Sequence, residues 1–398
     1  MASSITAQSL MEGCADHSFD SGIRLVANLE PQAGPGAPVK PATYEGGRYQ
    51  EDKRWATPTD TEATSVVVID NVPSQANRLE LALERGPIGM PEMILDLSDV
   101  AHLPAHLPRK LSSLQFAHRN ADAYLRDSSL DGEDFEKTQV GKAVFDATPW
   151  AAGPLMSWFP QSLLYGFWQS HLGKKRQQTK HARAWVSEII GWQPATTETK
   201  VMGVKGDALN LTSDVKITSN VDNRSQWEVG KANIKEGKPD KLSETGHGQV
   251  PFMKEGDTAA AGVSFTRITQ TATVSFSQLR RVGLGGSAEA DAASRALLVA
   301  MGLYAHVFGF GRPFSLRSGA DLRPASQQVT WLGATGDDDQ VLPVLSGPEA
   351  VSLVEHALAQ AREHGVPIDG WGAEPLMLAP KPNLRKAITD TWPEVDNG

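Results

Sequence analysis

A long polar segment interrupts this chain and limits the folds that it can adopt. Between positions 201 and 262, Asp, Asn, Ser, Gly and Lys dominate, and few large apolar side chains are present to build a core. A compact domain rarely contains so long an irregular stretch unless the stretch has a function of its own. We therefore expect a protruding loop or hairpin at 201–262, inserted into a core that is built from the chain on both sides.

The core around this insertion is expected to be discontinuous in sequence. Its first part is predicted at residues 22–200, with a loop insertion near residues 31–60 that is rich in Pro, Gly and charged residues. Its second part is predicted at residues 263–365. We expect residues 366–398 to form a C-terminal tail.

Hydrophobic periodicity predicts a mixture of strands and helices in both parts of the core. The predicted strands are 22–29, 66–69, 93–97, 263–276 and 328–334, and the predicted helices are 73–85, 115–128, 162–171, 287–308 and 348–364. These elements lack the strict alternation of a doubly wound parallel sheet. We therefore expect an α+β fold, in which helices cover one face of a mostly antiparallel sheet.

Composition indicates a soluble protein of a reducing compartment. The single cysteine, Cys14, excludes an intrachain disulfide and a zinc site of the CxxC type. The longest charge-free apolar stretch, 296–311, is too short for a confident membrane span, and the start of the chain does not read as a secretory signal. We expect a cytoplasmic protein with no membrane partner.

Charge is distributed unevenly along the chain. The formal net charge is -9, yet residues 66–330 hold 27 acidic and 29 basic residues, so the excess of acid lies in the two ends. Within this middle part, Lys174–Arg183 contains five basic residues and no acidic one. A second basic cluster begins at Arg280 and Arg281 and continues through Arg312, Arg317 and Arg323. Local clusters of this kind are the electrostatic footprint of a polyanion site, although any one of them could also be a solvated face.

Motifs for catalysis or cofactor binding are weak. The segment Gly283–Ala288 has the form GxGxxA of a dinucleotide fingerprint, but no acidic ribose ligand follows between Asp291 and Asp321. The glycines, next to Arg280 and Arg281, would suit a backbone phosphate at least as well. We therefore expect no cofactor and no metal, and a nucleotide-cofactor enzyme stays a minor alternative.

Several short motifs occur in an order that resembles one protein family. These motifs are Ser74-Gln75-Ala76-Asn77-Arg78, Ala117-His118-Arg119, Ser162-Leu163-Leu164-Tyr165-Gly166, Arg176-Gln177, Leu242-Ser243-Glu244-Thr245-Gly246, Leu279-Arg280-Arg281 and Phe314-Ser315-Leu316-Arg317-Ser318. Together they resemble the CRISPR-associated RAMP-superfamily backbone subunit of the type I-G (formerly I-U) Cascade surveillance complex. The resemblance runs from about residue 22 to 330. The acidic residue that the family has ahead of the Ser74 motif is displaced here to Asp70.

The resemblance implies an RRM-like (ferredoxin-type) antiparallel sheet core with a protruding thumb, for which 201–262 is the natural candidate. It implies a non-catalytic subunit that polymerises head to tail along CRISPR RNA in antiviral defence. That subunit would present the guide to a target DNA strand, with further copies of itself and other Cascade subunits as partners.

Motifs and basic clusters together give the candidate RNA-binding residues. They are Ser74, Gln75, Asn77, Arg78, His118, Arg119, Lys174, Lys175, Arg176, Gln177, Arg183, Arg280, Arg281, Arg312, Arg317 and Ser318. A guide that carries any spacer sequence must be held by phosphate contacts, which Lys, Arg and neutral donors supply. The alternative function is a RAMP-superfamily endoribonuclease that processes CRISPR repeat RNA, with His118 as general base.

Overall fold

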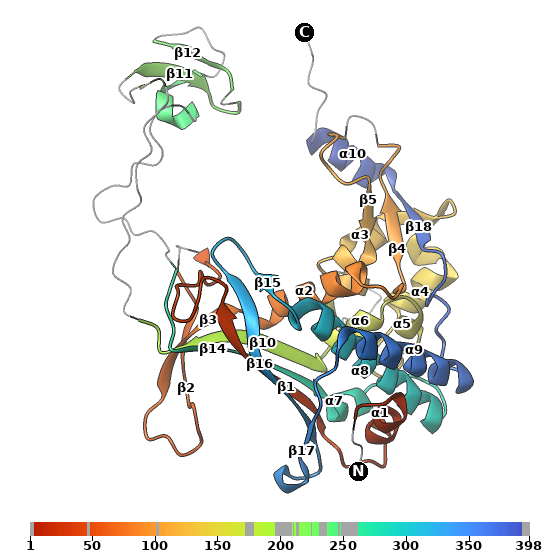
Figure 1. The fold of residues 1–398 in the computed structure, drawn as a ribbon. Helices are drawn as coiled ribbons and strands as arrows, with labels where there is room; N and C mark the ends of the chain where they lie inside the picture. Colours follow the sequence, from red (N-terminus) through yellow and green to blue (C-terminus); the bar gives the residue numbers. More distant parts are fainter. Residues whose placement is uncertain are drawn as a thin grey trace. The chain divides into compact units, whose positions relative to one another are not determined.

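The computed structural model describes two compact units, which we treat separately (Figure 1). Unit 1 comprises Met1–Ala42, Gln50–Pro194 and Ser264–Gly398, and unit 2 comprises Thr43–Tyr49 and Ala195–Val263. The residues described are 4–45, 48–100, 103–171, 179–195, 209, 211, 215–223, 225–230, 237–245, 247 and 262–391.

The main sheet of unit 1 has the strand order of a ferredoxin-type fold. Its four central strands are antiparallel and lie in the order β16-β1-β14-β10. In chain order the core reads β1 (Gly22–Pro31), α2 (Val72–Arg85), β10 (Trp185–Trp192), β14 (Arg267–Ser275), α8 (Ala288–Phe310) and β16 (Asp321–Leu332). This is the β-α-β-β-α-β arrangement of ferredoxin-like and RRM-like domains. The predicted α+β fold is therefore confirmed.

Four shorter strands extend this sheet at its edges. They are β3 (Thr64–Asp70) and β2 (Glu51–Arg54) beside β10, and β15 (Phe314–Ser315) and β17 (Gln340–Leu342) beside β16. Buried residues alternate along β1, because Ile23, Leu25 and Ala27 point into the core while Asn28 is exposed. That alternation is typical of a strand with one covered face.

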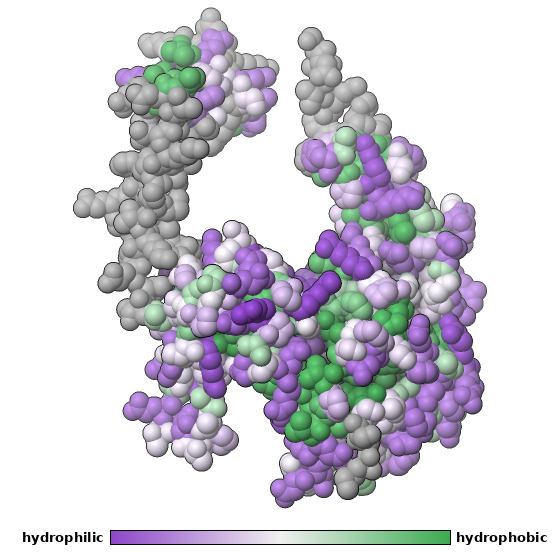
Figure 2. Space-filling model, viewed as in Figure 1, coloured by the Kyte–Doolittle hydropathy of each residue, from purple (hydrophilic) through white to green (hydrophobic). Residues whose placement is uncertain are grey.

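Helix α8 is the centre of the core. It contacts α2, α1 (Ala7–Cys14) and α9 (Gly347–Glu363), and Ser287 caps its first turn. It is the one helix of the described residues that is long and apolar enough to cross a membrane, but 83% of its most apolar window is buried inside the protein. Figure 2 shows hydrophobic side chains gathered near the helices α8 and α9, within a largely hydrophilic surface.

A second sheet in unit 1 joins distant parts of the chain. Its order is β5-β4-β18-β6-β7, and β18 runs parallel to β4 but antiparallel to β6. The strands are β4 (Met93–Asp96), β5 (Lys110–Ser112), β6 (Ser128–Leu130), β7 (Glu133–Asp134) and β18 (Leu376–Pro380), and α10 (Pro382–Thr391) follows β18. The segment that we expected to be a tail therefore contributes a central strand, whose Leu378 is buried.

Unit 1 also contains a two-stranded sheet, β8-β9, and several short helices. These elements are η2 (Ser113–Gln115), η3 (Arg119–Ala121), α3 (Ala123–Arg126), η4 (Phe135–Lys137), α4 (Gln139–Phe145), α5 (Pro154–Trp158), α6 (Pro160–Tyr165), β8 (Phe167–Gln169), β9 (Thr179–His181), α7 (Phe276–Arg280) and η6 (Gly336–Asp338).

Three predicted helices are confirmed and two are wrong. Those at 73–85, 287–308 and 348–364 correspond to α2, α8 and α9. The helix predicted at 115–128 is broken into short turns, because Arg119 has a positive φ of 56° and the side chain of Asp122 caps a new turn.

The other incorrect helix was predicted at 162–171. Helix α6 ends at Tyr165, because Gly166 adopts φ 78° and ψ 165°, a conformation that is essentially restricted to glycine. The chain then continues as β8.

Unit 2 contains a small antiparallel sheet in the order β12-β11-β13, followed by a short helix. The elements are β11 (Lys216–Asn220), β12 (Trp227–Val229), β13 (Gly237–Lys241) and η5 (Leu242–Thr245). Ile217 and Leu242 are buried in it. Most of the remaining part of the predicted insertion lies outside the described residues.

The burial of His306 on α8 predicts acid sensitivity. Burial against Trp185 and Phe310 lowers the pKa of His306 from 6.5 to about 4. Between these pH values the unfolded chain binds a proton at this position and the folded chain does not. The free energy of unfolding therefore has its full value above pH 6.5 and decreases as the pH falls toward 4. From pH 7 to pH 4, we expect the free energy of unfolding in urea to fall about 3 kcal/mol further in the wild type than in His306→Leu. Equal losses in both proteins would contradict this assignment.

Candidate nucleic-acid interface

A large cleft in unit 1 is lined by basic and imidazole side chains. Its volume is about 1540 Å³, and its walls come from the start of α2, residues 117–126, the β8–β9 hairpin and the start of β10. Its ionisable lining residues are His118, Arg119, Arg126, His171, Lys180, His181 and Arg183. No Asp or Glu is found among the lining residues that the structure describes. Arg119 is already paired with Glu80, and Arg126 lies 3.3 Å from the Asp127 carboxylate. The positive charge of the cleft therefore lies mainly on Lys180 and Arg183.

The β8–β9 hairpin is anchored through one face and open on the other. Phe167 and His181 are cross-strand partners, both are buried, and their rings stack at 5.4 Å. The Nε2 atom of His181 lies 3.1 Å from the carbonyl oxygen of Leu163. Burial lowers the pKa of His181, which favours a neutral, structural imidazole.

A buried ion pair fixes the root of this hairpin. Arg119 donates from Nε and Nη2 to the two carboxylate oxygens of Glu80, at 2.6 and 2.8 Å, and from Nη1 to the carbonyl oxygen of Gly166 at 3.1 Å. Its guanidinium also lies 5.7 Å from the ring centre of Tyr165. One side chain thus connects α2, the 117–126 segment and the turn that leads into β8. Because Arg119 is buried, we assign it a positioning role in place of the direct RNA contact expected from the sequence.

Arg183 is the arginine of the cleft whose positive charge is not balanced by any carboxylate that the structure describes. It is exposed and has no ion-pair partner among the described residues. Partial burial and the neighbouring Arg119 guanidinium both lower the pKa of the Arg183 side chain. The cleft therefore favours an incoming anion.

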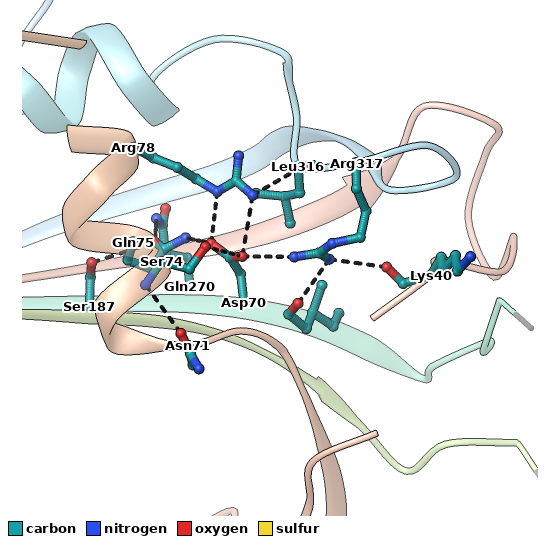
Figure 3. A network of polar contacts seen from close by, with 11 residues as sticks. Lys40, Asp70, Asn71, Ser74, Gln75, Arg78, Ser187, Gln270, Leu316 and Arg317 are labelled. Carbon is teal, nitrogen blue, oxygen red and sulfur yellow. Dashed lines mark hydrogen bonds and ion pairs between the residues drawn. The ribbon is translucent and has the colours of Figure 1, made fainter. Parts of the chain in front are cut away.

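A polar network centred on Asp70 fixes the start of α2 (Figure 3). Asp70 ends β3 and is fully buried. Its carboxylate accepts hydrogen bonds from Ser74 Oγ at 2.8 Å, Gln75 Nε2 at 2.5 Å, Arg78 Nε at 3.0 Å and Arg317 Nη2 at 2.9 Å. Asp70 therefore contacts the Ser74-Gln75-Ala76-Asn77-Arg78 segment directly.

The same network revises the roles of several candidate residues. Gln75 is fully buried and its Oε1 accepts from Gln270 Nε2 at 2.7 Å, so it positions α2 and cannot contact RNA directly here. Arg317 also donates to the backbone carbonyls of Lys40 and Ile69. Asn77, in contrast, is exposed and lines the large cleft.

Arginines also line a second, smaller pocket of about 160 Å³ beside α2. Arg78, Arg85 and Arg312 contribute to it, together with three phenylalanines of the segment that ends α8 and begins β15. Of these arginines, Arg78 donates to Asp70, which also accepts from Ser74 at the start of α2. The same helix carries Asn77, which lines the large cleft.

Arg280, Arg281 and Ser318 do not line the cleft. Arg280 donates to the backbone carbonyls of Gly13 and Asp20, at 2.9 and 2.7 Å, so its charge holds the N-terminal helix in place. Arg281 and Ser318 are exposed at other sites. Lys174, Lys175, Arg176 and Gln177 belong to the connection between β8 and β9, outside the described residues.

The glycine-rich loop before α8 has a packing role. A Cβ atom on Gly283 would lie 2.3 Å from the carbonyl oxygen of Trp150, and Gly285 has a φ of 84°. The start of α8 already receives Ser287 as its cap, and Asp291 accepts from the Gly286 amide. The described residues contain no group of three His, Cys, Asp or Glu side chains that could hold a metal.

Sequence reasoning missed three residues that shape the cleft. Glu80 shares the helix face of the buried Ala76 and Leu83, and a charge at such a position could have signalled a buried pair. Lys180 and Trp168 were not singled out, because their pairing across the hairpin depends on the strand register.

We expect the Glu80–Arg119 pair to be essential for the fold around the cleft. Glu80→Ala leaves a buried arginine without its carboxylate, which should lower the free energy of unfolding by about 3–5 kcal/mol. Glu84→Ala on the same helix, which removes only an exposed hydrogen bond from Gln115, should cost about 1 kcal/mol or less. Urea unfolding of both variants measures the difference, and similar small losses would contradict the assigned role.

Residues 23–195 match the family model described as CRISPR-associated protein GSU0053. The match covers less than half of the chain, and it includes Asp70, α2, the Glu80–Arg119 pair and the β8–β9 hairpin. No curated protein matches the chain. The family match supports a CRISPR-associated identity, consistent with a subunit that acts in antiviral defence.

Proposed function

We propose that this chain is a non-catalytic backbone subunit of a type I-G (formerly I-U) Cascade complex. It binds CRISPR RNA in the cytoplasm, polymerises head to tail along it with other Cascade subunits, and presents the guide for pairing with a target DNA strand. The observation that carries this proposal is the cleft in which Lys180 and Arg183 lie together and no carboxylate is present among the described lining residues.

The distribution of charge suits a guide of any sequence. A strand that carries variable spacers must be gripped by its phosphates, since base-edge contacts would restrict the sequence. The cleft supplies cations for this purpose, and exposed Asn77 adds a neutral donor. The overall charge of -9 opposes indiscriminate binding of nucleic acid at long range. The basic cleft attracts the RNA locally, while the net negative charge of the chain repels it elsewhere. Both effects favour binding of the strand within the cleft.

The fold supports repeated use of one subunit. On β1, Asn28 is exposed on the face opposite the buried Ile23 and Leu25, so this face of the sheet can meet a neighbouring subunit. Contacts between different surfaces of identical subunits are heterologous, and they build an open filament when the rotation does not close. The length of the bound RNA then limits the number of copies.

Charge reversal in the cleft tests the proposal. In Lys180→Glu/Arg183→Glu, we expect affinity for single-stranded RNA to fall roughly tenfold or more, because two phosphate contacts become repulsive. Mutation to Ala at both positions should make the dependence of log K on log salt shallower by about 1.4. Fluorescence anisotropy of labelled RNA at several salt concentrations measures both quantities.

The matched control is Arg362→Glu, which reverses an exposed charge on α9 that does not line the cleft. It should bind RNA like the wild type. RNA affinity and co-purification that are unchanged in the double cleft variant would reject the proposal.

One observation favours the endoribonuclease as a second candidate function. His118 is exposed within the cleft, where it would face the bound strand. Under our proposal, CRISPR repeat RNA incubated with purified wild type or with His118→Ala should stay intact in both cases, as seen on a denaturing gel. Site-specific cleavage by the wild type that is lost in His118→Ala would instead assign the chain as a processing nuclease.

A further inference from the structure

We infer that Trp168 is a stacking platform for an unpaired base of the bound strand. The inference rests on the proposed function, and it assigns a role to a residue that carries no charge and belongs to no motif of the sequence. Trp168 is 63% exposed and lines the cleft at the centre of β8. An exposed indole in a cationic cleft is an unusual use of the largest apolar side chain.

The register of the hairpin determines where this ring points. Along β8, Phe167 and Gln169 are buried while Trp168 between them is exposed. On β9, Trp168 faces Lys180, which is also exposed. Directly paired residues of an antiparallel hairpin lie on the same face. The indole and the ammonium group therefore project together from the open face, away from the stacked Phe167 and His181.

The root of the hairpin holds this face in place. Gly166 turns the chain from α6 into β8, and a Cβ atom there would lie 2.8 Å from the carbonyl oxygen of His181. Arg119 donates to the Gly166 carbonyl and is itself held by Glu80. A platform that is held before the ligand arrives loses little freedom on binding.

The surroundings of the ring select a nucleobase over a protein side chain. Pro73 and the 44%-exposed Val186 provide further apolar surface in the same cleft, and the ionisable lining residues are all basic or imidazole groups. A base that stacks on an indole carries its own phosphate, which Lys180 and Arg183 can neutralise. Every base has a π-face, so stacking adds affinity without restricting sequence. Only an unpaired base exposes that face, so the site discriminates against duplex RNA.

The experiment compares tryptophan variants in the full-length protein. Trp168→Ala should weaken binding of a single-stranded oligouridylate about 5- to 150-fold, the range typical of a lost base–aromatic stack. Trp168→Phe should recover part of the loss. The salt dependence should be unchanged in Trp168→Ala, because no phosphate contact is removed. Trp150→Ala, which removes a 79%-exposed ring outside the cleft, should bind like the wild type.

The outcomes separate this inference from the proposed function. If Trp168→Ala binds RNA like the wild type while Lys180→Glu/Arg183→Glu loses binding, the stacking role is wrong and the phosphate track stands. If Trp168→Ala keeps its RNA affinity but self-associates less, the ring is a contact between proteins, which also overturns the inference. If the wild type binds no RNA, the proposed function fails together with the inference. A stronger loss for single-stranded than for duplex RNA in Trp168→Ala supports stacking.

Discussion

The buried ion pair between Glu80 and Arg119 is the interaction on which the cleft depends. Glu80 lies on α2, and Arg119 lies in the irregular segment 117–126, where the sequence predicts a continuous helix. The third bond of Arg119, to the Gly166 carbonyl, adds the turn before β8. A buried ion pair is costly to desolvate and costly to break, so its value lies in the arrangement that it specifies. Here it specifies how three separate segments meet around one cleft.

The arginines around the cleft are of two kinds, those paired with a buried carboxylate and those without a carboxylate partner among the described residues. Arg119, Arg78 and Arg317 are held by Glu80 or Asp70 and by backbone carbonyls, so they fix the segments around α2. Arg183 has no carboxylate partner among the described residues and keeps its charge available. Nucleic-acid sites need both kinds, because a phosphate contact is strong only where the donor is already oriented.

Sequence predicted the ferredoxin-type core better than the cleft. The strands at Ile23 and Val67 and the helix capped by Ser287 are recognisable from local periodicity and capping. The break in the helix at Arg119 could not be recognised in this way, because a positive φ at a non-glycine residue is imposed by tertiary contacts. Parallel pairing of β18 with β4 joins segments far apart in the chain, and no local pattern predicts it. Motif and charge patterns predicted a polyanion site, but they could not separate Arg280, which holds a helix, from the exposed Arg183.

The central claim is that a single strand lies in the cleft between α2 and the β8–β9 hairpin. Photochemical crosslinking of the RNA-loaded protein, followed by mass spectrometry of the crosslinked peptides, tests it most directly. We predict that crosslinked peptides contain Trp168, His171 or Lys180 and the neighbouring Arg126. Crosslinks confined to the surface around Arg281, with none in the hairpin or in residues 117–126, would contradict the account.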